Sequence, residues 1–130
     1  MTERYAPHMF AILRIIAGLM FALHGSQMLL GWPPGAPASL PPLLRFGGII
    51  ELAGGLLIAV GLFARVAAFF SAGEMAVAYF MAHAPHGFLP LQNKGELAVV
   101  YCFLWLFVAA HGAGIWSVDA LMRSKKAVPA

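Results

Sequence analysis

Eight side chains that could carry chemistry lie inside or at the edge of stretches that are otherwise apolar: Arg14, His24, Gln27, Glu51, Glu74, His83, Glu96 and His111. A charged group at the centre of a bilayer costs about 2.5–3.5 kcal/mol on insertion scales, so such groups are expected to face protein and find partners there. Buried carboxyl groups can hold or exchange a proton. Together with imidazoles they can also bind zinc or manganese.

Five of these residues fall at similar depth in the predicted helices. We therefore expect a polar cavity open toward the outer face of a helix bundle, formed by His24, Gln27, Glu51, His83 and Glu96. Glu51 shares one helical stripe with Gly47 and Gly55, because the three residues are four apart. Small residues allow close helix approach, so this stripe predicts that Glu51 points into a helix contact.

Arg14 and Glu74 lie deeper, and we expect them to form an ion pair within the membrane. Structural roles remain open for the other residues. Glu51 could be a protonated acid that only hydrogen-bonds a neighbouring helix, and Glu96 could simply favour the start of its helix through the helix dipole. The histidines could be wall residues. Four of the cavity residues could ligate a metal, but no HExxH-like spacing supports it, and we predict no metal site.

The elements that must position these residues are four apolar segments, each near the ~20 residues that a membrane-spanning helix needs. They cover about residues 9–30, 46–64, 66–84 and 96–112. The stretch "GWPPGAPASLPP" is a loop because prolines cannot continue a helix. The second and third segments meet at Arg65 with almost no linker, which predicts a tight hairpin. Residues 120–130 read as a basic polar tail, and no long internal repeat is evident.

The composition supports this membrane assignment. Of the 130 residues, 62% are hydrophobic and only 10% are charged, whereas soluble domains carry about 25% charged residues. The expected fold is one all-α domain, a four-helix transmembrane bundle in a lipid bilayer. The single cysteine, Cys102, excludes an internal disulfide and a CxxC pair. The net charge of +3 does not indicate nucleic-acid binding.

The basic residues predict the orientation, because cytoplasmic loops are enriched in Lys and Arg. With both termini inside, the inner side carries five basic residues, Arg4, Arg65, Arg123, Lys125 and Lys126. The outer side carries two, Arg45 and Lys94. This count favours an N-in, C-in topology.

Four stretches resemble the DoxX family of small bacterial membrane proteins: "LRIIAGLMFALHGSQML", "GIIELAGGLLIAVGLFARVAA", "GEMAVAYFMAHAPHGFLPLQNKGELAVVYCFLWL" and "GAGIWSVD". The resemblance covers about residues 10–121. It implies four spanning helices in a bacterial inner membrane. It also implies a role as a membrane subunit or scaffold of a redox complex, since the family takes its name from a subunit of a thiosulfate:quinone oxidoreductase.

Three functions follow from these observations. The chain could be a non-catalytic membrane subunit of a redox complex, with a soluble or membrane redox enzyme as partner and a quinone as its only cofactor, and with Glu51 or Glu74 exchanging the proton. It could be an assembly or interaction protein whose polar residues serve packing alone. It could also be a small transporter or a binder of a lipophilic molecule, which would require a homo-oligomer for transport.

Overall fold

The structure is a computed structural model that describes residues 2–37 and 39–127, and all the regular elements in these residues are helices, joined by short loops. Within them the α-helices are α1 (Ala6–Leu30), α2 (Pro42–Val60), α3 (Ala64–Ala78), α4 (Pro90–Asn93), α5 (Glu96–His111) and α6 (Val118–Ala127). A 3₁₀ turn, η1 (Glu3–Tyr5), precedes α1. A π-helical turn, η2 (Tyr79–His83), and a 3₁₀ turn, η3 (Ala84–His86), prolong α3. The predicted all-α class is confirmed.

Prolines and glycines set the helix boundaries. Helix α2 begins at Pro42 rather than at the predicted Phe46, because the first position of a helix tolerates a residue without an N–H. Helices α1 and α2 end at Gly31 and Gly61, whose φ angles are 71° and 74°. Glycine adopts this left-handed conformation without steric cost. Helix α3 then begins at Ala64, so the second and third segments are joined by a short turn, as predicted, but it lies at residues 61–63 rather than at Arg65.

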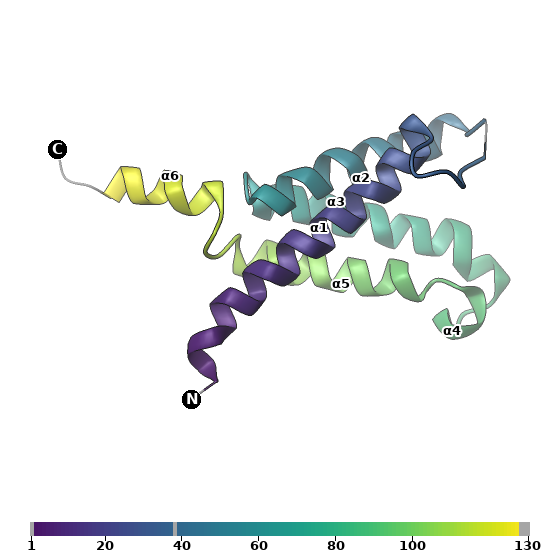
Figure 1. Cartoon of the computed structure of the whole chain (residues 1–130). Coiled ribbons are helices and arrows are strands. Elements are labelled where there is room, and N and C mark those ends of the chain that lie inside the picture. Colours follow the sequence, from purple (N-terminus) through teal and green to yellow (C-terminus); the bar gives the residue numbers. More distant parts are fainter. Residues whose placement is uncertain (1, 38, 128–130) are drawn as a thin grey trace.

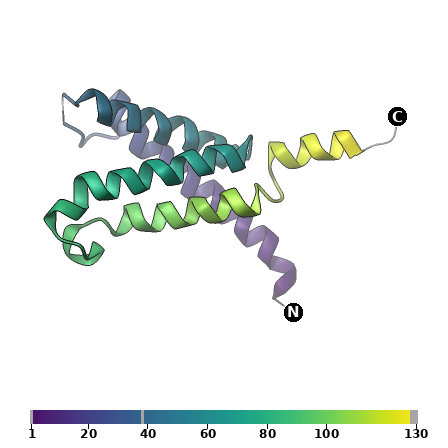
Figure 2. The ribbon, with the colours of Figure 1, turned by 180° about the vertical axis from the view of Figure 1, so that it is seen from behind.

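The helices form two antiparallel hairpins. Helix α1 packs along α2, and α3 packs along α5, while α2 and α3 join the two hairpins. Figures 1 and 2 show α1 crossing the others obliquely, with the start of α1 and helix α6 at the same end of the molecule. Residues 120–127 of the expected polar tail belong to helix α6, and residues 128–130 lie outside the described residues. Helix α6 extends away from the bundle (Figure 1), and the Ser117 hydroxyl caps it by accepting the Ala120 N–H at 3.1 Å.

Glycines bring α1 and α2 into backbone contact. A Cβ atom at Gly55 would lie 2.6 Å from the Gly18 carbonyl oxygen, and one at Gly18 would lie 2.8 Å from the Gly55 carbonyl oxygen. Further along, a Cβ at Gly25 would lie 2.5 Å from the Gly48 oxygen. Such small-residue contacts are the usual means of close helix packing in membranes. Gly47, on the same helix, faces α3 instead.

Among the described residues, three helical stretches are long and apolar enough to cross a membrane: Glu3–Leu30, Pro42–Val60 and Ala64–His86. Helix α5 is also apolar but has 16 residues, which at ~1.5 Å per residue spans less than a hydrocarbon core of about 30 Å. Large apolar side chains are exposed on all four long helices, among them Leu19, Leu56, Phe69 and Phe103. A lipid environment accounts for this surface, since soluble monomers rarely expose such continuous apolar faces.

Candidate ligand cavity and buried acid pair

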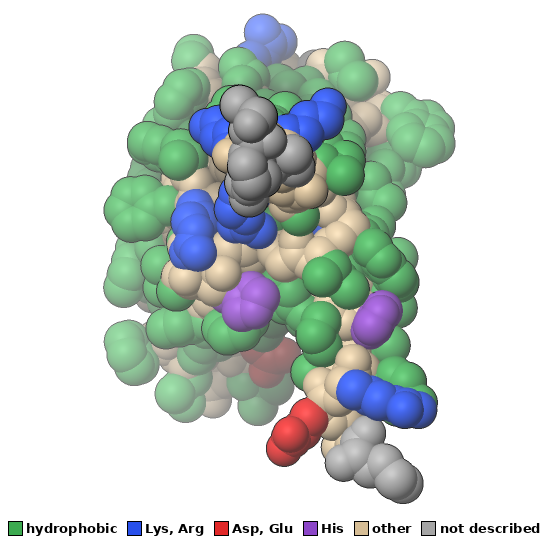
Figure 3. Space-filling model, turned by 90° about the vertical axis from the view of Figure 1, so that its left-hand side faces the viewer, with side chains coloured by type: hydrophobic (Ala, Val, Ile, Leu, Met, Phe, Trp, Pro, Cys, Tyr) green, Lys and Arg blue, Asp and Glu red, His purple; other side chains and the backbone are tan. Residues whose placement is uncertain are grey.

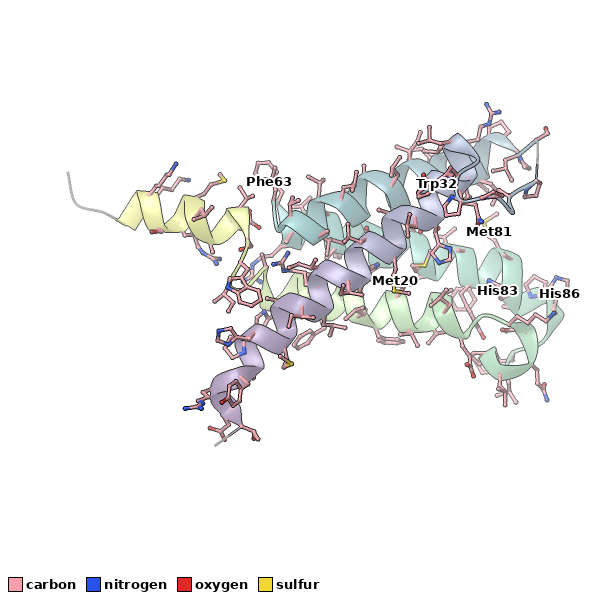
Figure 4. The ribbon with its side chains drawn as sticks, viewed as in Figure 1. Met20, Trp32, Phe63, Met81, His83 and His86 are labelled. Carbon is pink, nitrogen blue, oxygen red and sulfur yellow. The ribbon has the colours of Figure 1, made fainter. Side chains whose placement is uncertain are left out.

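An open cavity of about 250 Å³ lies between the two hairpins. Its walls come from α1, α2, α3, η2, α5 and the loop before α5, and its lining residues are Phe21, His24, Glu51, Met75, Ala78, His83, Lys94, Leu97, Ala98 and Tyr101. The walls are therefore mostly apolar, with a few polar groups. Figure 4 shows His83 at the end of the bundle where α3 is connected to α5, opposite the α2–α3 turn that carries Phe63.

The structure brings three of the five predicted cavity residues together, His24, Glu51 and His83. The other two lie elsewhere. The Gln27 side-chain amide donates a hydrogen bond of 2.9 Å to the Pro34 carbonyl and so ties α1 to the following loop. Glu96 lies in the first turn of α5 and is exposed, where the helix dipole favours a negative charge. The prediction for Gln27 and Glu96 rested on their depth along the helices. Depth does not determine the side of a helix on which a residue lies, so these two residues do not line the cavity.

Glu51 is 7% exposed and reaches the cavity from α2. The Glu74 carboxyl group from α3 lies close to that of Glu51. Two buried carboxyl groups this close favour a proton on one of them, because two negative charges would repel each other. Gly47 makes room for this pair, because a Cβ atom there would lie 3.0 Å from Glu74 Oε1. The absence of a side chain at Gly47 thus leaves room for the acid pair, and the absence of one at Gly55 lets α1 approach α2.

Each acid keeps one oxygen unused. Glu51 Oε2 and Glu74 Oε2 are buried and make no hydrogen bond to the residues that the structure describes. Buried polar atoms are nearly always hydrogen-bonded, so such atoms call for an explanation. Only Glu51 lines the cavity, so Glu51 is the acid that could receive a hydrogen bond from a ligand or exchange a proton with it.

The predicted ion pair between Arg14 and Glu74 is replaced by two separate arrangements. Glu74 pairs with Glu51, whereas Arg14 is fully buried among backbone carbonyls. Its Nη1 donates to Ile58 and Ala59 at 2.7 and 2.6 Å, and its Nη2 to Ile115 and Trp116 at 3.2 and 2.7 Å. The last carbonyls of a helix lack intrahelical partners and carry partial negative charge, so they attract a cation.

Arg65 repeats this arrangement in the second hairpin. It donates to the carbonyls of Ala109, Ala110 and His111 at the end of α5. Arg14 bonds carbonyls 44 and 45 residues further along the chain, and Arg65 bonds carbonyls at the same two separations. The two hairpins thus share one arrangement, in which an arginine of the first helix bonds the last carbonyls of the second helix. The sequence analysis did not detect this repeat, since the matching residues are few and mostly apolar.

Sequence reasoning also missed three residues that shape the cavity: Tyr101, Lys94 and Asn93. The spacing of Ala98, Tyr101 and Trp105 marks the buried face of α5 and was the available signal for Tyr101. Lys94 was assigned only to a loop. Its position depends on Asn93, 5% exposed, whose amide donates to the Tyr79 hydroxyl at 3.1 Å and to the Gly87 carbonyl at 2.7 Å.

Asn93 also holds the start of α5 and the rim of the cavity. Its Oδ1 accepts the Gly95 N–H at 2.8 Å, and its own carbonyl lies 3.1 Å from His83 Nδ1. One buried amide therefore joins η2, the loop and α5. Among the described residues, no group of three or more His, Cys, Asp or Glu side chains is placed to hold a metal ion.

Comparison with known proteins agrees with this architecture. The sequence profile of the DoxX family matches residues 9–84, more than half of the chain. The chain belongs to the DoxX family. It is also 43% identical over 124 residues to an uncharacterized protein of Haemophilus influenzae (strain ATCC 51907 / DSM 11121 / KW20 / Rd), a match that covers 90% of this chain and 92% of the relative. No solved structure matches this DoxX protein.

Proposed function

We propose that this DoxX protein is the non-catalytic membrane subunit of a redox complex and binds a lipophilic carrier with a hydrogen-bonding ring, of the quinone class, in its cavity. The observation that carries the proposal is Glu51, which lines the otherwise largely apolar cavity and whose buried Oε2 has no hydrogen-bond partner among the described residues. Membership of the DoxX family supports a membrane protein, but it does not define the biochemical function. The proposal extends to four spanning helices in a bacterial inner membrane with both termini inside.

The size and chemistry of the cavity fit such a ligand. Benzene fits an engineered cavity of about 150 Å³, so the 250 Å³ here accommodates a substituted six-membered ring. Phe21, Met75 and Leu97 supply apolar walls, and Lys94 and His24 supply donors toward the mouth. The cavity is open, so an apolar tail can continue into the surrounding lipid.

A quinone held there would supply two-electron chemistry that takes up two protons on reduction. The residues of this chain supply none of the electrons, which must come from a partner redox enzyme. Glu51 can give up or accept one proton, because the shared proton of the Glu51–Glu74 pair can lie on either carboxyl group. The second proton reaches the site through the open mouth, past His24 and His83.

The test is the binding of a short-chain benzoquinol, the reduced form whose hydroxyl groups can donate to Glu51, to the full-length protein in mild detergent without oxygen, followed by tryptophan fluorescence. Trp105 is buried and stacks on Tyr101 with 5.5 Å between ring centroids, and Tyr101 lines the cavity. Its emission should therefore be quenched. Replacing the exposed Trp32 and Trp116 with phenylalanine removes the background.

Glu51→Gln should weaken binding by about tenfold, the worth of one hydrogen bond of ~1.4 kcal/mol, without lowering the melting temperature. Glu96→Gln is the matched control, since it makes the same change outside the cavity. Equal binding by the two variants would refute the role of Glu51. No saturable quenching in the wild type would refute a quinone-class ligand and leave the assembly or interaction function.

A further inference from the structure

A second, basic pocket lies at the other end of the molecule, where α6 leaves the bundle. It has a volume of about 290 Å³ and is lined by Phe63, Ala64, Arg65, Val66, Ala113, Asp119, Met122, Arg123 and Lys126. Figure 3 views the molecule from this end and shows Lys and Arg side chains gathered around it. The pocket is far from the candidate cavity along the bundle axis, since Phe63 and His83 lie at opposite ends (Figure 4).

The charge of this pocket is positive. Three basic side chains line it, Arg65, Arg123 and Lys126, against one acid, Asp119. Both oxygens of Asp119 are already engaged: Oδ1 accepts the Phe63 N–H at 2.9 Å and Oδ2 accepts the Ala64 N–H at 3.0 Å. Arg123 and Lys126 are exposed on α6. The carboxylate therefore serves the start of α3, and the basic residues of α6 can approach an external anion.

An apolar groove continues from the basic pocket. This groove, about 490 Å³, runs along the outer side of α2 and α3 and is lined by Ile49, Ile50, Ala53, Gly54, Leu57, Phe63, Val66, Ala67, Phe70 and Ser71. Phe63 and Val66 line both hollows. A site that is basic at one end and apolar along the other matches a molecule with an anionic head and a hydrocarbon chain.

We propose that this composite site binds one anionic phospholipid, with its phosphate against Arg123 and Lys126 and an acyl chain in the groove on α2 and α3; Arg65, whose terminal nitrogens bond the end of α5, adds positive charge beside the phosphate. A free phosphate ion would use the basic pocket but gain nothing from the groove. An acidic protein could bind the basic residues of α6, but it would not supply the hydrocarbon chain that fits an apolar groove facing lipid. Basic pockets beside transmembrane helices bind lipid head groups through the same chemistry. This inference is independent of the proposed redox function.

Native mass spectrometry of the full-length protein in mild detergent tests the site. Phosphatidylglycerol and phosphatidylcholine with identical acyl chains are added in turn, and inorganic phosphate serves as the free-anion probe. The wild type should retain one phosphatidylglycerol in preference to phosphatidylcholine, and millimolar inorganic phosphate should not displace it.

Removing both charges of α6, by Arg123→Gln with Lys126→Gln, should weaken phosphatidylglycerol retention by about thirtyfold, since a basic residue near an anionic lipid surface contributes ~1 kcal/mol. The matched control is Arg4→Gln with Lys125→Gln, which removes the same charge from exposed residues outside the pocket. The control should bind nearly as the wild type does. An equal loss in both double variants would overturn the site in favour of diffuse surface charge.

The groove has its own test. Ala53→Phe places a ring in the groove and should lower retention of long-chain phosphatidylglycerol, whereas Leu19→Phe, on the exposed face of α1, should not. Equal retention by these two variants would overturn the acyl-chain contact. Equal retention of the two lipids by the wild type, displacement by inorganic phosphate, or recovery of an acidic protein in place of lipid would each overturn the phospholipid assignment.

Discussion

Replacing Gly55 with alanine should separate α1 from α2, because its hydrogen atoms face backbone. The added Cβ would lie 2.6 Å from the Gly18 oxygen and 2.5 Å from the Ala22 nitrogen. Ordinary van der Waals contacts begin at 3.4 Å, so the helices must move apart by close to 1 Å. Neither neighbour can rotate away, since both atoms belong to the main chain of α1.

The size of the effect follows from overpacking, which costs about 1–3 kcal/mol when rigid groups must shift. Because both close contacts are with main-chain atoms, the upper part of this range, about 2–3 kcal/mol, applies. Alanine recovers ~1 kcal/mol of helix propensity, so the net loss for Gly55→Ala should be about 1–2 kcal/mol. At roughly 4 °C per kcal/mol for a domain of this size, the melting temperature should fall by about 4–8 °C. Thermal unfolding of the purified protein in mild detergent measures this.

Gly73 provides the control, since it lies in α3 and a Cβ atom there would have no neighbour within 4 Å. Gly73→Ala should leave the melting temperature unchanged or raise it, because only the propensity gain remains. If Gly55→Ala and Gly73→Ala shifted the melting temperature equally and in the same direction, the close α1–α2 contact would be refuted.

Two further substitutions test the ends of the bundle. Asp119→Ala removes the acceptor for the N–H groups of Phe63 and Ala64 and should cost about 1–2 kcal/mol, as the loss of a helix cap does; thermal unfolding measures it, and a loss below that of the exposed Lys125→Ala would contradict the cap. Asn93→Ala removes the amide that joins Tyr79, Gly87 and Gly95, so amide hydrogen exchange should accelerate in η2 and the start of α5 but not in α1; unchanged exchange in η2 would contradict the joining role.

The sequence was sufficient to predict elements because apolar length, prolines and glycines determine them locally. Helix α2 ends where Gly61 permits a positive φ angle, and the Gly47–Glu51–Gly55 stripe does face helix contacts. Helix α6 was missed because its composition is polar and its start depends on Ser117 and on an Asp119 N–H bond of 2.9 Å to the Gly61 carbonyl. That bond joins residues far apart in the sequence.

The candidate site was harder to predict, because depth along a helix says nothing about rotation around the bundle. Glu51 and Glu74 were each recognised as unusual, but Glu74 was predicted to pair with Arg14 because opposite charges attract and Arg14 is the only cation at similar depth. This prediction failed because backbone carbonyls can also stabilise a buried cation. Helix ends offer such carbonyls in groups, and the chain brings two groups to Arg14, one from α2 and one from the segment before α6.

The buried charged residues differ in their hydrogen-bond partners, and this difference indicates their roles. The two terminal nitrogens of Arg14 meet four carbonyl oxygens, so this residue joins three segments; its Nε has no partner among the described residues, but Arg14 lines none of the cavities described above. Glu51 and Glu74 have each other and one unused oxygen apiece. Packing alone would be served better by an acid whose acceptors are all satisfied, since an unpaired buried polar atom costs about 1–3 kcal/mol. Glu51 retains this cost beside an open cavity, where a ligand that donates a hydrogen bond would remove it.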